Sequence, residues 1–294
     1  MRSNVAEYDM VAPASLTAAL EALASDPGLY TPIAGGTELM VALSAGRLPQ
    51  KYLLSINHLR ELRFLSITAD TVTIGSGTTF TDLRRSAVIA SDFPLLSQAA
   101  SWTGSIANQN RGTLGGNIVN ASPAADSPPA LLAYDATLTL ISARGTRTMS
   151  YGDFHLGYKK TALQPDELLY SITLERSFTG YHSYIRKVGA RNAQAISKVA
   201  LACLALVSDG EPGIIQDIRI GAASLRESPT RCTAAEQSLL GQRLTPQTIG
   251  PLVAAARAAL AGEARPIDDI RSTAKYRAAV AANLLEEFLR SLLP

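Results

Sequence analysis

The sequence predicts a two-domain α+β protein, with a larger N-terminal domain followed by a small α+β C-terminal domain. Its 294 residues exceed the usual size of one domain, so two hydrophobic cores are expected. The first half mixes strand and helix patterns around two glycine-rich loops, whereas the second half has three strand patterns followed by three helix patterns. We place the domains at residues 1–176 and 177–294.

The first elements are a helix and a strand that lead to a glycine pair. Ser15 is a suitable N-cap for a helix over residues 15–24, which ends at Asp26-Pro27-Gly28. In YTPIAGGTELMVAL, the apolar pair Ile33-Ala34 is followed directly by Gly35-Gly36 and then by a pattern of apolar residues typical of a helix. Thr37 suits the N-cap of that helix, and Glu38 its positive first turn. Such a turn exposes backbone N–H groups that can hold phosphate oxygens, although one such loop is a weak signal.

The elements that follow are mainly strands. Residues 51–56 read as a buried strand, residues 65–67 and 71–74 as a hairpin, and residues 93–102 as a helix. Trp102, which ends that helix, is interpreted as a core anchor in preference to a ring stacked on a cofactor. Residues 136–142 and 168–174 are the next strong strands, and residues 153–160 are expected to be a loop.

The second glycine-rich stretch, residues 110–135, reads NRGTLGGNIVNASPAADSPPALLAYD. The pair Gly115-Gly116 is flanked by the short hydrogen-bonding side chains of Thr113 and Asn117. The composition predicts a poor helix and a poor strand, and either a wall for a polar ligand or an ordinary surface loop. Because two glycine loops occur in one domain, we favour a pair of walls that hold a diphosphate from both sides.

The C-terminal part predicts a meander of three strands over residues 181–189, 196–207 and 214–225. Helices are expected at residues 233–240, 249–260 and 273–292. In the last helix, Tyr276, Val280, Leu284 and Phe288 form an apolar stripe, which we interpret as packing against the domain, with a partner helix as the alternative.

Several of these segments resemble one family. PIAGGTEL and TLGGNIVNASPAAD are similar to the two FAD loops of the FAD-binding (medium) subunit of molybdenum hydroxylases, of the xanthine dehydrogenase and aerobic carbon monoxide dehydrogenase type. KVGARNAQAISKV (187–199) and DIRSTAKYRAAVAANLL (269–285) also resemble family segments, in the same order along the chain. The chain departs from the family at residues 107–110, where Ala-Asn-Gln-Asn stands in place of a common Gln-Ile-Arg-Asn.

The resemblance implies a PCMH/VAO-type FAD-binding domain made of two α/β subdomains. The C-terminal domain would be the molybdenum hydroxylase flavoprotein type, with a three-stranded antiparallel sheet and helices. GSGTTF at residues 75–80 nearly matches a dinucleotide fingerprint, but Phe80 replaces the last glycine and no clean βαβ unit precedes it. A Rossmann fold is therefore rejected, and this segment is expected to be a strand end that leads into a helix over residues 81–90.

The resemblance also implies the cofactor site. Backbone amides of residues 34–38 would hold the FAD pyrophosphate with the Thr37 hydroxyl, and Asp126 would accept hydrogen bonds from a hydroxylated part of the cofactor. Leu169 would contact the flavin and Lys187 would place a positive charge near the ring; the alternatives are a core strand residue and a solvated charge. The predicted cofactor-binding residues are Ile33, Ala34, Gly35, Gly36, Thr37, Glu38, Thr113, Gly115, Gly116, Asn117, Asp126, Leu169 and Lys187.

By resemblance, the chain would be an oxidoreductase subunit that transfers electrons. A large molybdopterin-binding subunit would hydroxylate the substrate, and a small subunit would relay electrons through two [2Fe–2S] clusters to FAD and then to NAD+, dioxygen or another acceptor. Residues 190–199 look closest to the xanthine branch, so purines are the first guess; carbon monoxide, aldehydes and N-heteroaromatics stay open. Two alternatives remain: a stand-alone FAD-dependent small-molecule oxidase, and a nucleotide-binding module without redox chemistry.

Composition excludes several other classes. Lys and Arg exceed Asp and Glu by only two, and no basic cluster is interleaved with aromatic residues, so nucleic acid is not an expected partner. Cys203 and Cys232 form no CxxC pair, and Cys203 lies in the apolar run VALACLALV. The three histidines lack metal-ligand spacing, and no nucleophile is paired with a base, so no catalytic or metal-binding residue is predicted.

The N-terminus has no apolar segment typical of a secretory signal, and no apolar run approaches the ~20 residues that span a bilayer. A cytoplasmic location is the expectation, although a subunit can be exported on a partner's signal.

Overall fold

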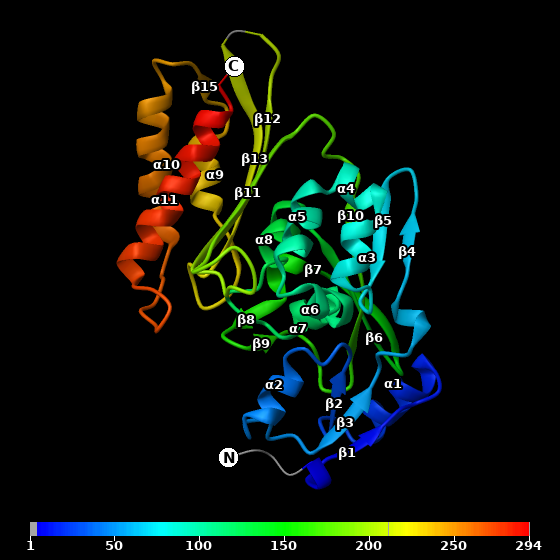
Figure 1. Cartoon of the computed structure of the whole chain (residues 1–294). Helices are drawn as coiled ribbons and strands as arrows, with labels where there is room; N and C mark the ends of the chain where they lie inside the picture. The colour runs from blue at the N-terminus through cyan, green and yellow to red at the C-terminus, as the bar shows by residue number, and fades with distance from the viewer. Residues whose placement is uncertain (1–4, 211, 294) are drawn as a thin grey trace.

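The computed structural model describes residues 5–210 and 212–293. Three units follow one another along the chain (Figure 1): an N-terminal subdomain drawn in blue, a second subdomain drawn in cyan and green, and a C-terminal domain drawn from yellow-green to red. The first two units together form the predicted mixed N-terminal domain. The fold class predicted from the sequence is confirmed.

The first subdomain is a three-stranded parallel sheet in the order β1-β3-β2, with a helix on each face. Leu20 and Leu23 of α1 pack on one face with Leu54, and Leu43 of α2 packs on the other with Leu53. Ser15 caps α1 by accepting from Ala18 N, as predicted. The elements are η1 (Val5–Glu7), β1 (Asp9–Val11), α1 (Leu16–Ser25), β2 (Tyr30–Ile33), α2 (Leu39–Ser44) and β3 (Tyr52–Ser55).

The second subdomain is a five-stranded antiparallel sheet in the order β4-β5-β10-β6-β7, packed against a group of short helices. Ile74, Leu138 and Ile172 of the sheet meet Phe80 and Leu96 of the helices in the largest core of this half. The elements are η2 (Arg60–Leu62), β4 (Leu65–Ile67), β5 (Thr71–Gly75), α3 (Phe80–Arg85), α4 (Ala87–Asp92), α5 (Pro94–Trp102), α6 (Ile106–Arg111), α7 (Leu114–Val119), α8 (Pro128–Ala133), β6 (Thr137–Ser142), β7 (Gly145–Ser150), η3 (Tyr151–Asp153), β8 (His155–Gly157), β9 (Lys160–Thr161) and β10 (Leu168–Glu175).

Three local predictions in this subdomain were wrong. The helix expected over residues 81–90 is divided into α3 and α4 at Ser86, whose hydroxyl accepts from Ile89 N and starts a new helix. The glycine-rich stretch 110–135 contains α7 and α8, because Thr113 caps α7 and burial of its apolar residues outweighs the low helix propensity of glycine. Residues 155–161, expected to be a loop, form the β8–β9 hairpin.

The C-terminal domain contains the predicted meander β11–β12–β13, and the short strands β14 and β15 extend it beyond the three strands expected. Helices α9, α10 and α11 cover one face of this sheet (Figure 1), and α5 and α8 of the second subdomain pack on the other. The elements are β11 (His182–Val188), β12 (Val199–Val207), β13 (Gly213–Ala223), β14 (Thr230–Arg231), α9 (Thr233–Leu239), β15 (Arg243–Leu244), α10 (Ile249–Glu263) and α11 (Ala274–Ser291).

Strand β12 is buried on both faces, which explains its unbroken apolar sequence. Leu201 and Cys203 belong to the core beneath α9–α11, whereas Ala202 and Leu204 belong to the core of the second subdomain. On the adjacent strand, a Cβ at Gly221 would overlap the carbonyl oxygen of Pro129, so the sheet lies directly on the backbone of α8. The two domains therefore share a tightly packed interface.

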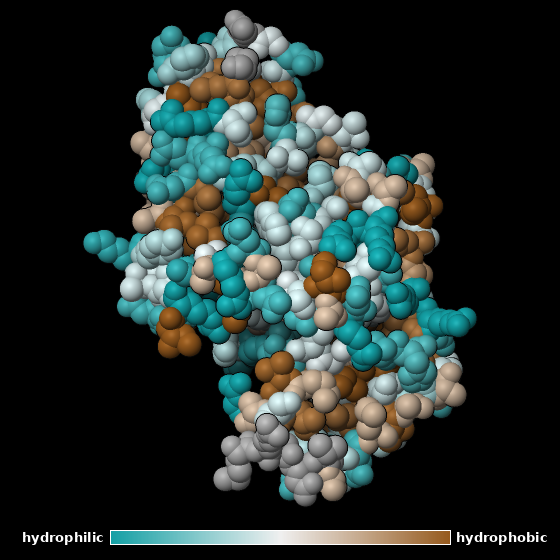
Figure 2. All heavy atoms as spheres, viewed as in Figure 1, coloured by the Kyte–Doolittle hydropathy of each residue, from teal (hydrophilic) through white to brown (hydrophobic). Residues whose placement is uncertain are grey.

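The stripe predicted on α11 is only partly buried. Leu284 and Phe288 are buried and Val280 packs at the edge of the core, but Tyr276 is 43% exposed. Figure 2 shows hydrophilic and hydrophobic residues intermixed on the viewed face. Among the described residues, no helix is both long and apolar enough to cross a membrane.

Candidate functional site

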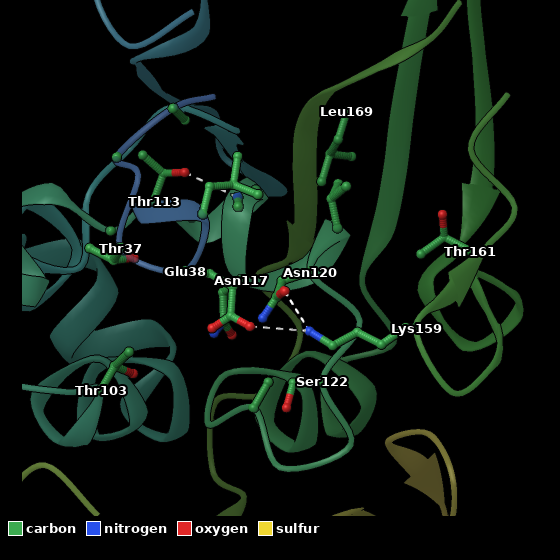
Figure 3. A pocket seen from close by; sticks show the side chains of 18 of the residues that line it. Thr37, Glu38, Thr103, Thr113, Asn117, Asn120, Ser122, Lys159, Thr161 and Leu169 are labelled. Carbon is green, nitrogen blue, oxygen red and sulfur yellow. Dashed lines mark hydrogen bonds and ion pairs between the residues drawn. The ribbon is translucent and has the colours of Figure 1, made fainter. Parts of the chain in front are cut away.

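A cavity of about 1280 Å³ lies where the two subdomains and the C-terminal domain meet (Figure 3). It exceeds the few hundred to ~1,000 Å³ typical of pockets for drug-sized ligands, which suits an extended dinucleotide. Of the predicted cofactor-binding residues, all except Ile33 and Lys187 line it. Ile33 lies at the end of β2 in the core next to α2. Lys187 lies behind the wall, paired with the lining residue Asp126.

The first glycine loop offers a row of unused donors. The backbone N–H groups of residues 35–38 donate no hydrogen bond to any described residue. Gly36 has a φ of +75°, which glycine adopts without strain. A Cβ at Gly35 would overlap the carbonyl oxygen of Arg111, so this loop touches the segment that precedes the second loop. The result is a set of adjacent N–H donors at a cavity wall, which suits an anion.

The capping expected at this loop was wrong. The N-cap of α2 is Glu38 rather than Thr37, and the Glu38 side chain makes no capping hydrogen bond. Its carboxylate instead points toward Lys159 across the cavity, with Oε1 3.5 Å from Nζ (Figure 3). Thr37 lines the cavity with its hydroxyl available.

The second loop is shaped by close packing and leaves one amide available. The N–H of Gly115 donates to Ser76 O at 2.9 Å, and the N–H of Gly116 donates to Thr113 Oγ1 at 3.0 Å. Asn117 Oδ1 accepts from the buried hydroxyl of Ser127 at 2.6 Å, which fixes the side chain. Its NH₂ group donates to no described residue, so this amide is the donor that the second wall presents.

Asp126 and Lys187 form an ion pair at the domain interface. Lys187 Nζ lies 2.7 Å from Asp126 Oδ2 and also donates to Trp102 O, while Ser197 Oγ donates to the other carboxylate oxygen. Burial raises the pKa of the Asp126 carboxyl, and Lys187 and Ser197 act in the opposite direction. Only 10% of the Lys187 side chain is exposed, so the alternative of a solvated charge was wrong.

Leu169 is a core strand residue that also faces the cavity, so its predicted contact with the flavin stays a prediction. It lies in β10, it is 4% exposed and it belongs to the core of the second subdomain, yet it also lines the cavity (Figure 3). Trp102 is neither a core anchor nor a wall of this cavity, because it is half-buried and outside the lining.

Sequence reasoning missed several parts of the wall. Ser76 and Gly77 line the cavity, and both belong to the rejected GSGTTF fingerprint, which was therefore a signal for them. The β8–β9 hairpin adds Tyr158, Lys159 and Thr161, for which no local signal existed. The C-terminal domain adds residues 194–197, the turn within the family-like segment 187–199.

These observations fit FAD. The cavity has room for a dinucleotide, unused backbone N–H groups for phosphate oxygens, the amide of Asn117 on the opposite wall and the apolar side chain of Leu169 for a ring. Within the described part of the chain, no three His, Cys, Asp or Glu side chains converge as metal ligands. The fold and the cavity therefore suit a two-domain protein that binds a flavin dinucleotide.

Comparisons with known proteins agree. A family described as "FAD binding domain in molybdopterin dehydrogenase" matches residues 6–175, and the "CO dehydrogenase flavoprotein C-terminal domain" matches residues 184–292. The glyceraldehyde dehydrogenase medium chain of Sulfolobus acidocaldarius is 31% identical over 92% of this chain and 93% of its own. The xanthine dehydrogenase FAD-binding subunit of Escherichia coli O157:H7 is 31% identical over 80% of both. Carbon monoxide dehydrogenase from Hydrogenophaga pseudoflava superposes with a TM-score of 0.91 at 28% identity, over 99% of this chain and 98% of that one.

The chain belongs to the family of FAD-binding medium subunits of the xanthine dehydrogenase and carbon monoxide dehydrogenase type. It is therefore a subunit of an oxidoreductase, a molybdenum hydroxylase, and FAD is its cofactor. In this family, molybdopterin and iron–sulfur clusters reside on the large and small partner subunits. The resemblance found in the sequence is confirmed.

Proposed function

We propose that the cavity holds FAD with its diphosphate between the amides of residues 35–38 and the side chain of Asn117. Bound FAD would accept electrons from the [2Fe–2S] clusters of a small partner subunit and deliver them to NAD+ or another acceptor. The observation that carries the proposal is the run of unused N–H groups at residues 35–38, opposite the free amide of Asn117. As part of the same proposal, the FAD-binding domain ends near residue 176.

The chain's own residues would bind and shield the cofactor. Leu169 offers an apolar surface, and the Asp126–Lys187 pair adds a fixed cation behind the wall. Asp126 already accepts two hydrogen bonds from side chains, so a cofactor hydroxyl would use the remaining lone pairs of its carboxylate. Substrate oxidation would take place on the large partner subunit, which carries the molybdopterin in this family.

The substrate would be selected by that other subunit. The chain is 31% identical both to a subunit named for glyceraldehyde and to one named for xanthine, so the percentage identity does not choose between them. Purines such as xanthine are the first class to assay because of the segment 190–199, and aldehydes are the second. We also place the complex in the cytoplasm, which the two free, buried cysteines suit because thiols persist in reducing compartments.

The proposal is tested with the purified chain and with the purified complex. The chain alone should show flavin absorption bands, and after anaerobic chemical reduction those bands should return when NAD+ is added, if NAD+ is the acceptor. Substrate-dependent reduction should require the partner subunits. Turnover of substrate by the chain alone would favour a stand-alone oxidase, and a colourless chain that takes up no FAD would overturn the flavoprotein function.

A further inference from the structure

The β8–β9 hairpin connects the two glycine loops, which lie far from it in the sequence. Its turn residues Tyr158 and Lys159 both line the cavity. Lys159 has a φ of +55°, in the left-handed region that glycine and asparagine favour at hairpin turns. A lysine in this conformation is uncommon, and such outliers gather where the side chain has a function.

The Lys159 side chain reaches both walls of the cavity (Figure 3). Its Nζ donates to Asn120 Oδ1 at 2.6 Å, at the end of α7, and lies 3.5 Å from Glu38 Oε1 in the first glycine loop. Glu38 is the last of the four residues, 35–38, whose N–H groups are unused. The ammonium group is therefore held between the two loops that face each other across the cavity.

The base of the hairpin is anchored, so this position is fixed before a ligand arrives. His155 Nε2 lies 2.9 Å from the hydroxyl of the buried Tyr151, and Ala162 N donates to Phe154 O at 2.9 Å after the second strand. Burial lowers the pKa of His155 to about 4, so the ring is neutral at pH 7. A preorganised cation binds an anion with less loss of conformational entropy than a mobile one.

Among the cavity-lining residues in the described chain, Lys159 is the one cation contributed by the N-terminal domain. The other lining cations, Arg226, Arg271 and Arg277, come from the C-terminal domain, and both Arg271 and Arg277 pair with Asp269. A diphosphate carries full negative charges, whereas backbone N–H groups supply partial positive charges only. Among the described lining residues of the N-terminal domain, only Lys159 therefore carries a full positive charge that could pair with a diphosphate.

We propose that Lys159 is a diphosphate-binding residue, which exchanges its contact with Glu38 for the bound diphosphate of the flavin dinucleotide. The proposal rests on the proposed function of the cavity, and it adds a residue outside the two glycine loops. Asn120 keeps the ammonium group in place, while Glu38, whose side chain is 61% exposed, is free to turn toward solvent. The positive charge then lies beside the N–H groups of residues 35–38.

The test compares Lys159→Met with Lys160→Met, the adjacent exposed lysine that does not line the cavity. Flavin-free protein is titrated with FAD at two salt concentrations and with riboflavin, which lacks phosphates, and folding is checked by circular dichroism. Lys159→Met should raise the Kd for FAD about tenfold and weaken its salt dependence, as expected for a lost charge-assisted contact. Lys160→Met should match the wild type, and Lys159→Arg should retain most of the affinity.

Three outcomes would overturn the role of Lys159. The first is a wild-type Kd for FAD in Lys159→Met. The second is an equal loss of FAD and riboflavin affinity, and the third is an unchanged salt dependence; either of these two would mean that the hairpin only supports the fold. Failure of the wild-type chain to bind any flavin would instead contradict the proposed function, so the two failures are distinguishable.

Discussion

Lys187 Nζ lies 2.7 Å from the carboxylate of Asp126 and joins β11 of the C-terminal domain to the loop before α8. Both side chains are about nine-tenths buried. Lys187 also donates to Trp102 O, and Ser197 binds the second oxygen of Asp126, so four segments converge on one ion pair. This pair therefore links the C-terminal domain to the segments beside the cavity.

Replacing Lys187 by Met should leave the Asp126 carboxylate buried without its counter-charge. Loss of one partner of a buried pair typically costs about 3–5 kcal/mol. Urea unfolding at pH 8 should show a loss of this size, and it should be smaller in acid because a protonated Asp126 needs no counter-ion. The matched control is the double variant Lys187→Met/Asp126→Asn, which should recover part of the stability. A single variant as stable as the wild type would show that the pair does not hold the interface.

Replacing Gly221 by Ala should separate the two domains, because the new Cβ would overlap Pro129 O. We expect a loss of about 1–3 kcal/mol or more in the free energy of unfolding. Gly250→Ala in α10 is the matched control, since its Cβ would meet open space. That substitution should be neutral or stabilise the protein by up to about 1 kcal/mol. Equal melting temperatures for the two variants would refute the close packing of β13 on α8.

His155 should make stability depend on pH between about 4 and 6.5. Its folded-state pKa is about 4, below the ordinary histidine pKa of 6.5, because the ring is buried beside Tyr151. In that window the unfolded chain binds the extra proton, so the free energy of unfolding rises as pH rises and falls as pH falls. After allowance for partial exposure, we expect a contribution of about 1–2 kcal/mol. Denaturation curves of the wild type and His155→Gln across this range would test it, since the variant should lose this part of the slope.

Replacing Thr113 by Val should weaken the start of α7. The substitution removes the oxygen that accepts from Gly116 N, and loss of such a cap costs about 1 kcal/mol. The cap also positions Asn117 one turn later, so FAD affinity should fall together with stability. Thermal unfolding and an FAD titration of the same sample measure both, and a loss of stability with unchanged affinity would remove α7 from the site.

Local signals in the sequence were sufficient for much of the fold. Ser15 begins α1 as predicted, and the apolar run of β12 is unbroken because both faces are buried. The start of α7 was not predictable from propensity, since glycines and an asparagine form a helix there only because of its cap and its burial. The resemblance to the flavoprotein subunits, rather than any periodicity, brought Asp126 and Lys187 into one predicted site.

Contacts between residues far apart in the sequence could not be predicted from local sequence patterns. Lys159 meets Glu38 across 121 residues, and neither turn residue, Tyr158 or Lys159, is of a type that favours a left-handed conformation. The Asp126–Lys187 contact spans 61 residues and depends on the packing of one domain against the other. Such pairs form because the fold brings separate segments together, so they can be identified only in the three-dimensional structure.

The most direct test of the site is an FAD titration of the flavin-free wild-type chain and of Gly35→Ala, followed by absorption and fluorescence. A Cβ at Gly35 would collide with Arg111 O and push apart the two segments that form the walls. We predict one tightly bound FAD per wild-type chain and a loss of more than about a hundredfold in affinity for Gly35→Ala, with an unchanged circular dichroism spectrum. A folded Gly35→Ala protein that binds FAD as tightly as the wild type would contradict the account and move the diphosphate away from the glycine loops.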